Sequence, residues 1–96
     1  MAEYRLTSRA GADLAGIADY AIEAFGVEQA RRYRDESEAC FESLAGNPRL
    51  GRDASQLVPG PRRFEHRSQT IFYAEEGEGV LIIRILHVGM DALRHL

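Results

Sequence analysis

Histidines have the widest chemical repertoire of the side chains in this sequence, and there are only three: His66, His87 and His95. Histidines that bind a metal together normally sit at close spacing, such as four residues apart on a helix. None of these three histidines is spaced in that way, and the single cysteine, Cys40, is far from them in sequence. The motifs of serine hydrolases, phosphate-binding loops and zinc proteases are also absent. We therefore predict no metal, no cofactor and no catalytic residue of these classes. His87, at the end of an apolar run, fits a hydrogen-bonded structural histidine better than a catalytic one.

Arginine carries the remaining positive charge, with twelve arginines and no lysine, which removes Schiff-base and amine chemistry. Arg62 and Arg63 open one predicted strand, and Arg84 interrupts the apolar run 80–88. A buried guanidinium needs a partner, because an unpaired buried charge is costly. Two interpretations of Arg84 stay open. It could pair with a carboxylate such as Glu65 or Asp91, or it could face an open concave surface that meets a partner or a phosphate.

The charge balance argues against a protein that binds nucleic acid by itself. The formal net charge is −3 and the isoelectric point about 5.6, whereas phosphate contacts supply most nucleic-acid affinity. Residues 1–46 hold five arginines against nine acidic residues, a net charge of −4, and residues 47–96 hold seven against six, a net charge of +1.

No apolar run is long enough to span a membrane, no secretory signal is visible, and one cysteine suits a reducing compartment. These features predict a cytoplasmic protein without membrane contact.

Periodicity predicts the elements that position these residues. Residues 3–7 alternate like a short strand, and Ser8 is placed to cap a helix over 9–25 that Gly26 ends in a left-handed conformation. A second helix keeps the same apolar period through Leu44, with Cys40 on its core face, until the sequence GNP at 46–48 stops it. The short connection predicts an antiparallel helical hairpin.

A long proline-rich and glycine-rich loop, 47–61, precedes three predicted strands at 62–67, 70–74 and 80–88. Simple alternation in the last strand places Val80, Ile82, Arg84 and Leu86 on one face, and we expect this strand to be central. The predicted fold is one α+β domain over residues 1–96: an N-terminal strand, the helical hairpin, a three-stranded antiparallel meander and a short C-terminal tail.

Four ordered motifs resemble a known family. They are the series that begins YRLT over 4–33, LAGNPRLGR at 44–52, PGPRRFEHRSQTIFY at 59–73 and IIRILHVGMDALRHL at 82–96. Together they resemble the ParE toxins of the RelE/ParE superfamily, and the match covers nearly the whole chain. The family fold is the architecture expected above. One departure is Gln69, where many relatives have histidine.

The resemblance implies the toxin of a bacterial type II toxin–antitoxin module, one that inhibits DNA gyrase and is neutralised by a ParD-type antitoxin in a hetero-oligomer. We expect the C-terminal strand and tail, with two arginines of the first meander strand, to form the target face: Arg62, Arg63, Arg84, His87, Met90, Asp91 and Arg94. We expect the helical hairpin and the long loop to bind the antitoxin, through Leu14, Ile17, Tyr20, Tyr33, Leu50 and Leu57.

The sister RelE branch supplies an alternative function, a ribosome-dependent mRNA endoribonuclease. Such an enzyme needs basic and aromatic groups on the concave sheet face and just after the last strand, to orient the 2′-hydroxyl and stabilise a charged phosphorane-like transition state. This chain has Met90 and Asp91 there. Arg62, Tyr73, Arg84 and His87 could still compose a minimal nuclease site. A third possibility is a degenerate toxin-like module that only binds its antitoxin.

Overall fold

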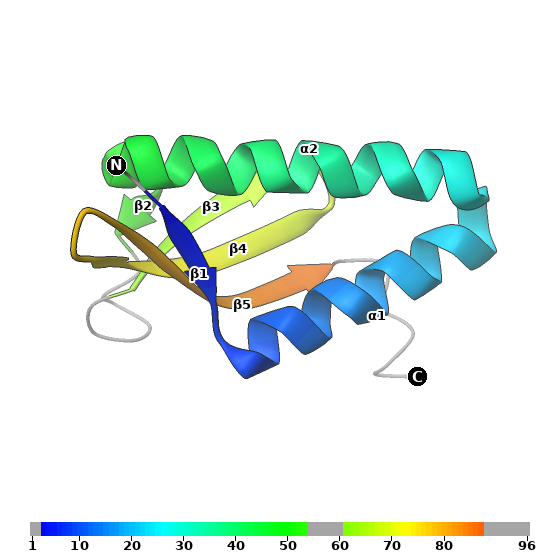
Figure 1. Cartoon of the computed structure of the whole chain (residues 1–96), viewed down its shortest axis with the longest axis horizontal. Coiled ribbons are helices and arrows are strands. Elements are labelled where there is room, and N and C mark those ends of the chain that lie inside the picture. Colours follow the sequence, from blue (N-terminus) through cyan, green and yellow to red (C-terminus); the bar gives the residue numbers. More distant parts are fainter. Residues whose placement is uncertain (1–2, 54–60, 88–96) are drawn as a thin grey trace.

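The computed structural model describes residues 3–53 and 61–87, with the side chains of Arg52 and Asp53 left aside. The predicted order of elements is confirmed, a strand followed by two helices and a meander (Figure 1). The elements are β1 (Tyr4–Leu6), α1 (Ser8–Phe25), α2 (Val27–Gly46), the 3-10 turn η1 (Pro48–Leu50), β2 (Arg52–Asp53), β3 (Arg62–His66), β4 (Gln69–Glu76) and β5 (Gly79–His87).

One five-stranded sheet carries the fold, in the order β1-β5-β4-β3-β2. β1 runs parallel to β5, and the other neighbours are antiparallel. The antiparallel helices α1 and α2 lie over the sheet, with β1 crossing at its near edge (Figure 1). The loop predicted over 47–61 is partly ordered as η1 and β2, and residues 54–60 lie outside the described part.

The N-terminal cap of α1 is Thr7, so the expected cap at Ser8 was wrong by one residue. Thr7 Oγ1 accepts a hydrogen bond from the Ala10 N–H (3.0 Å) and donates one to the Ile83 carbonyl (2.7 Å), which ties the start of the helix to β5. At the other end, Gly26 has φ +90°, and its N–H closes the helix on the Ile22 carbonyl (2.9 Å). The helix therefore ends at Gly26, as predicted. The positive φ explains the glycine, because L side chains rarely adopt this φ.

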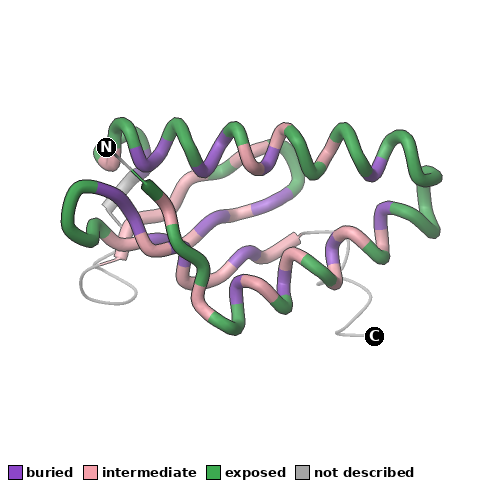
Figure 2. The backbone as a smooth tube through the Cα atoms, viewed as in Figure 1, coloured by how far each residue is buried: buried purple, intermediate pink, exposed green. Residues whose placement is uncertain are grey.

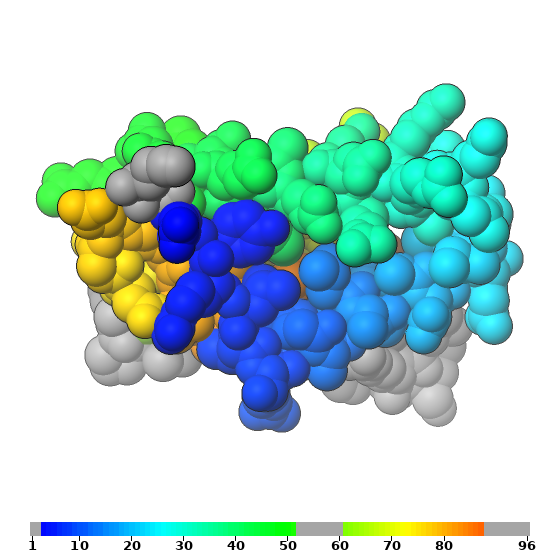
Figure 3. All heavy atoms as spheres, viewed as in Figure 1, coloured from blue at the N-terminus to red at the C-terminus, as the bar shows by residue number. Residues whose placement is uncertain are grey.

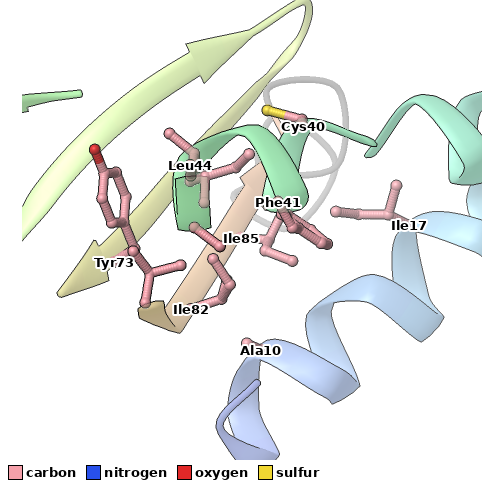
Figure 4. Close-up of a cluster of buried hydrophobic side chains, with 11 residues drawn as sticks. Ala10, Ile17, Cys40, Phe41, Leu44, Tyr73, Ile82 and Ile85 are labelled. Carbon is pink, nitrogen blue, oxygen red and sulfur yellow. The ribbon is translucent and has the colours of Figure 1, made fainter. Parts of the chain in front are cut away.

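The hydrophobic core lies between the hairpin and the sheet (Figures 2 and 4). Phe41 and Leu44 of α2 pack against Ile71, Ile82 and Ile85 of β4 and β5, all fully or almost fully buried. Full burial of each such side chain contributes about 1.5–3 kcal/mol to stability. Cys40 belongs to the same cluster, as expected, and burial raises the pKa of its thiol.

The turn at 48–51 is held against the sheet by Tyr73. The Tyr73 hydroxyl donates a hydrogen bond to the Pro48 carbonyl (2.6 Å) and accepts one from the Gly51 N–H (2.8 Å). A Cβ at residue 51 would collide with the Tyr73 ring and lie 2.8 Å from the Arg63 carbonyl oxygen, so this close approach requires glycine. The motif at 44–52 therefore has a structural role in fixing the end of α2 to the sheet.

A bulge in the meander changes the face on which Arg84 lies. Phe72 pairs with Arg84 but Tyr73 pairs with Ile82, so Ile83 is an extra residue in β5. The buried row therefore runs Val80, Ile82, Ile85. The expectation that Arg84 continues the face of Val80 and Ile82 was wrong, because strict alternation along a strand fails at a bulge.

Candidate functional site

Arg84 forms an ion pair with Asp13, a residue of α1 that lies 71 positions away in sequence. Arg84 Nε and Nη2 donate to the two Asp13 carboxylate oxygens at 2.7 and 3.1 Å. The Ile85 N–H donates to the same carboxylate at 3.0 Å. The expectation of a carboxylate partner is met by Asp13. Glu65, one of the two partners considered, is instead 3.4 Å from Arg63, and Asp91 lies outside the described residues.

Asp13 and Thr7 together serve as a substitute for a missing strand. β1 pairs with β5 only as far as Ile82. Beyond that point, the Ile83 carbonyl accepts from the Thr7 hydroxyl and the Ile85 N–H donates to Asp13. Backbone groups at a buried sheet edge need hydrogen-bond partners. The side chains of Asp13 in α1 and of its cap residue Thr7 are these partners. A faint signal for this role was present in the sequence, since Asp13 is a charged residue on the otherwise apolar inner face of a helix.

The two arginines of β3 point to opposite sides of the sheet. Arg62 is half-buried, and its Nη1 donates to the Gly51 carbonyl at 3.1 Å, so it supports the 48–51 turn. Arg63, one residue later and therefore on the other face, lies 3.4 Å from Glu65 and is partly exposed.

His87 packs between two tyrosines of the helical hairpin. Its ring lies 5.4 Å from that of Tyr20 and 6.0 Å from that of Tyr33, measured between centroids. Burial raises the pKa of Tyr33 to about 12, with the opposing influence of Arg67 and a further small rise from Glu36. The surroundings of His87 are therefore aromatic and on the helix side of the sheet.

The described target-face candidates do not share one surface. Arg62 and His87 lie on the helix side of the sheet. Arg63 and Arg84 both lie opposite Phe72 and so share the other face, where Arg84 is bound to Asp13 of α1. Met90, Asp91 and Arg94 fall outside the described residues. Their role in target binding stays a prediction.

Four of the six antitoxin candidates lie in or beside a groove between the two helices. The groove has a volume of about 300 Å³, and Leu14, Ile17 and Tyr33 are among its lining residues. A furrow runs between α1 (blue) and α2 (cyan to green) in Figure 3. A smaller cavity of about 100 Å³ adjoins it, shares Ile17 and Tyr33, and adds Tyr20 and His87. Four predicted residues are thus brought together by the hairpin.

Leu50 lies elsewhere. It borders a second groove of about 470 Å³, between α2 and β3, together with Cys40, Phe64 and His66. The two grooves are on different sides of α2, so one short segment could not fill both as a single helix. Leu57 lies outside the described residues.

Exposed apolar side chains mark the hairpin tip. Phe25 is 64% exposed, Val27 58% and Ile22 44%. Exposed apolar patches often mark protein-binding surfaces. Within residues 3–53 and 61–87, no three histidine, cysteine, aspartate or glutamate side chains are placed to hold a metal ion, and neither helix is long and apolar enough to cross a bilayer.

Comparison with known proteins places this fold among toxins of toxin–antitoxin systems. A solved structure described as a chromosomal ParDE TA system from P. aeruginosa superimposes with a TM-score of 0.75 at 26% identity, over 92% of this chain and 97% of that one. Toxin ParE1 of Caulobacter vibrioides is 43% identical over 96 residues, covering all of this chain and 99% of its own. Toxin ParE1 of Mycobacterium tuberculosis is 38% identical over 94 residues, covering 97% and 96% of the two chains. Toxin ParE of Escherichia coli is 35% identical over 97 residues, covering all of this chain and 94% of its own.

The family model for the ParE toxin of the type II toxin–antitoxin system parDE matches residues 4–92. This chain therefore belongs to the ParE toxin family.

Proposed function

We propose that this chain is the toxin of a ParDE-type module, that it inhibits DNA gyrase without being an enzyme, and that a ParD-type antitoxin neutralises it. The observation that carries the proposal is the family match over residues 4–92, with full-length relatives named as ParE toxins. Inhibition of gyrase follows from the resemblance to this branch of the superfamily. Such a toxin would act in the bacterial cytoplasm, where gyrase works on DNA.

The side chains that could have composed a minimal nuclease site are each engaged elsewhere. The Arg84 guanidinium meets Asp13, the Arg62 guanidinium meets the Gly51 carbonyl, and the Tyr73 hydroxyl meets Pro48 and Gly51. His87 lies between tyrosine rings on the helix side. A nuclease needs acid, base and cationic groups that converge on one phosphate. Arg62 and Tyr73 meet at Gly51, but Arg84 and His87 are held elsewhere, and this distribution supports a toxin that acts by binding.

The antitoxin is assigned to the groove between α1 and α2. The groove is lined mainly by apolar side chains, and the exposed apolar residues of the hairpin tip extend the apolar surface. A segment that folds on binding would lay an apolar face into such a groove. Leu14, Ile17, Tyr20 and Tyr33 are the proposed contacts, whereas Leu50 would need a separate part of the antitoxin.

The target face is proposed around Arg63, which is partly exposed on the sheet face opposite the helices. Met90, Asp91 and Arg94 remain proposed target contacts. The position of Arg63 leaves the α1–α2 groove to the antitoxin.

Purified protein incubated with gyrase and plasmid DNA tests the function. We expect loss of supercoiling, accumulation of gyrase–DNA cleavage complexes, or both. Arg63→Glu should weaken the effect, whereas Arg32→Glu, on the exposed side of α2, should leave it intact. No effect on gyrase at excess toxin would overturn the proposed target.

Primer extension on mRNA after expression separates the alternatives. Intact transcripts during growth arrest support the non-enzymatic toxin. New transcript ends would instead identify a ribosome-dependent endoribonuclease, and expression without growth arrest would identify a module that only binds its antitoxin.

A further inference from the structure

Three polar side-chain atoms at one end of the sheet are buried without a hydrogen-bond partner in the described part of the chain. They are the Tyr33 hydroxyl, His66 Nε2 and Gln69 Oε1. Gln69 is only 1% exposed, although glutamine side chains mostly lie at the protein surface. Nearly all buried polar atoms in proteins are paired with other protein atoms or with ordered water. Three exceptions in one place therefore need a common explanation.

The three side chains belong to one layer between α2 and the sheet. His66 of β3 pairs with Gln69 of β4, and such directly opposite residues share a face with their Cβ atoms about 5 Å apart. Gln69 Nε2 donates to Ser37 Oγ of α2 at 3.2 Å, so this face lies under the helix. Tyr33 is four residues before Ser37, one turn along the same side of α2. The layer is thus bounded by two strands and by one turn of α2.

Direct contacts within the protein leave the hydrogen bonding of this layer incomplete. Ser37 engages the amide nitrogen of Gln69, and the carbonyl oxygen of the same side chain remains an open acceptor. The buried hydroxyl of Tyr73, by contrast, makes both of its hydrogen bonds with protein atoms. An open hydroxyl at Tyr33 is therefore not a general feature of this core. A water molecule both donates and accepts, so it could meet a carbonyl oxygen, a ring nitrogen and a hydroxyl at once.

The charges beside the layer favour a neutral ligand over an ion. Both oxygens of the Glu36 carboxylate are bound by Arg67, with Nε 2.9 Å from Oε2 and Nη2 3.1 Å from Oε1. Burial raises the pKa of Tyr33 to about 12, while Arg67 lowers it and Glu36 raises it. The Tyr33 hydroxyl therefore keeps its proton at neutral pH and can donate it in a hydrogen bond.

Solvent can reach the layer beside His66. His66 lines the groove of about 470 Å³ between α2 and β3, together with Glu36 and Cys40. Tyr33 lies on the other side and lines the cavities of the helical hairpin. The layer therefore separates two hollows of the surface, and a small molecule such as water could enter it from the α2–β3 groove.

We propose that Tyr33, His66 and Gln69 bind one internal water molecule that links α2 to the end of the sheet. The water donates to the Gln69 carbonyl oxygen, accepts from the Tyr33 hydroxyl and makes its third hydrogen bond with His66 Nε2. Three hydrogen bonds are typical of a buried water. The site goes beyond the proposed toxin function, because it depends on neither gyrase nor the antitoxin. Its role is to position Tyr33 and the β3–β4 turn relative to each other.

A crystal structure of the full-length protein, at a resolution that shows ordered water, tests the site directly. We expect one electron-density peak within hydrogen-bond distance, about 2.6–3.2 Å, of the Tyr33 hydroxyl, His66 Nε2 and Gln69 Oε1. Direct pairing among these three atoms would overturn the proposal. So would well-ordered side chains without a peak between them.

A double-mutant cycle tests the same water in solution. If the Tyr33 hydroxyl had no partner, Tyr33→Phe would leave the unfolding midpoint unchanged or raise it. With the water bound, the same change should lower the midpoint by at least about 4 °C. Gln69→Met keeps the length of the side chain but removes the acceptor. The double variant should fall short of the sum of the two single losses by at least about 2 °C.

This coupling reports the water, because the Tyr33 hydroxyl and the Gln69 amide share no direct hydrogen bond. Tyr20→Phe is the matched control: its ring also packs on His87, but its hydroxyl is not among the buried atoms of the layer. Its effect on the midpoint should simply add to that of Gln69→Met. A Tyr33→Phe variant as stable as the wild type, or one whose loss adds fully to that of Gln69→Met, would contradict a shared water.

Discussion

Replacement of Asp13 by alanine tests how α1 is fixed to the sheet. The carboxylate accepts three hydrogen bonds, from Arg84 Nε, Arg84 Nη2 and the Ile85 N–H. The Ile85 N–H is buried, and loss of its acceptor costs about 1–3 kcal/mol. Removal of one member of a fully buried ion pair costs about 3–5 kcal/mol. The Arg84 side chain is 30% exposed, so water recovers part of that cost.

We therefore expect Asp13→Ala to lower the free energy of unfolding by about 3 kcal/mol, out of the 5–15 kcal/mol that is typical of small domains. Asp13→Asn keeps the shape and one acceptor oxygen, so it should lose about half as much. Equilibrium urea denaturation followed by circular dichroism gives both values.

A double variant checks that the loss comes from the pair. Arg84→Met removes the other member, and Asp13→Ala combined with Arg84→Met should be less destabilised than the sum of the single changes by about 1 kcal/mol or more. The reasoning would be refuted if Asp13→Ala stayed within about 0.5 kcal/mol of the wild type, or if the two changes were additive.

Three further perturbations address other contacts of the fold. Tyr73→Phe removes the two hydrogen bonds between the Tyr73 hydroxyl and the 48–51 turn and should cost about 1–3 kcal/mol in urea denaturation, and unchanged stability would contradict a role of this hydroxyl in holding the turn. Gly79→Ala places a Cβ against the backbone of Glu3, so β1 should separate from β5 and the Val80 amide should exchange faster with solvent; unchanged exchange would show that β1 accommodates the Cβ. Burial raises the pKa of Tyr33 from 10.0 to about 12, so the folded state keeps a proton that the unfolded chain loses. Stability should therefore fall between about pH 10 and 12, by at most about 1.4 kcal/mol per pH unit, and Tyr33→Phe should flatten that fall in urea denaturation at matched pH.

The helices and strands were predictable from the sequence because they depend on local signals. The apolar period of three to four residues marked both helices, Gly26 and the GNP sequence at 46–48 marked their ends, and short alternating runs marked the strands. The four ordered motifs were enough for the resemblance to ParE toxins, and the family match over 4–92 agrees with it. Even the misplaced cap was off by one residue, because Thr7 and Ser8 both have a suitable hydroxyl.

The candidate site was only partly predictable, because it depends on which distant residues meet. A bulge of one residue in β5 moved Arg84 off the buried row, and no local sequence pattern predicts this bulge. The docking of α1 against the uncovered edge of β5 then selected Asp13 as its partner, across 71 residues of sequence. The groove arose in the same way, since its lining residues from α1 and α2 meet only when the two helices lie side by side.

The sequence by itself thus determined the elements, their order, the core residues and the family resemblance, because each depends on patterns among residues that are close in sequence. The tertiary structure alone decided that Arg62 and Tyr73 meet at Gly51, whereas Arg84 is bound to Asp13 and His87 packs between two tyrosines. It also decided that Leu14, Ile17, Tyr20 and Tyr33 share a surface. The physical reason is that side-chain direction and partnership depend on strand register and on helix docking, which long-range packing sets.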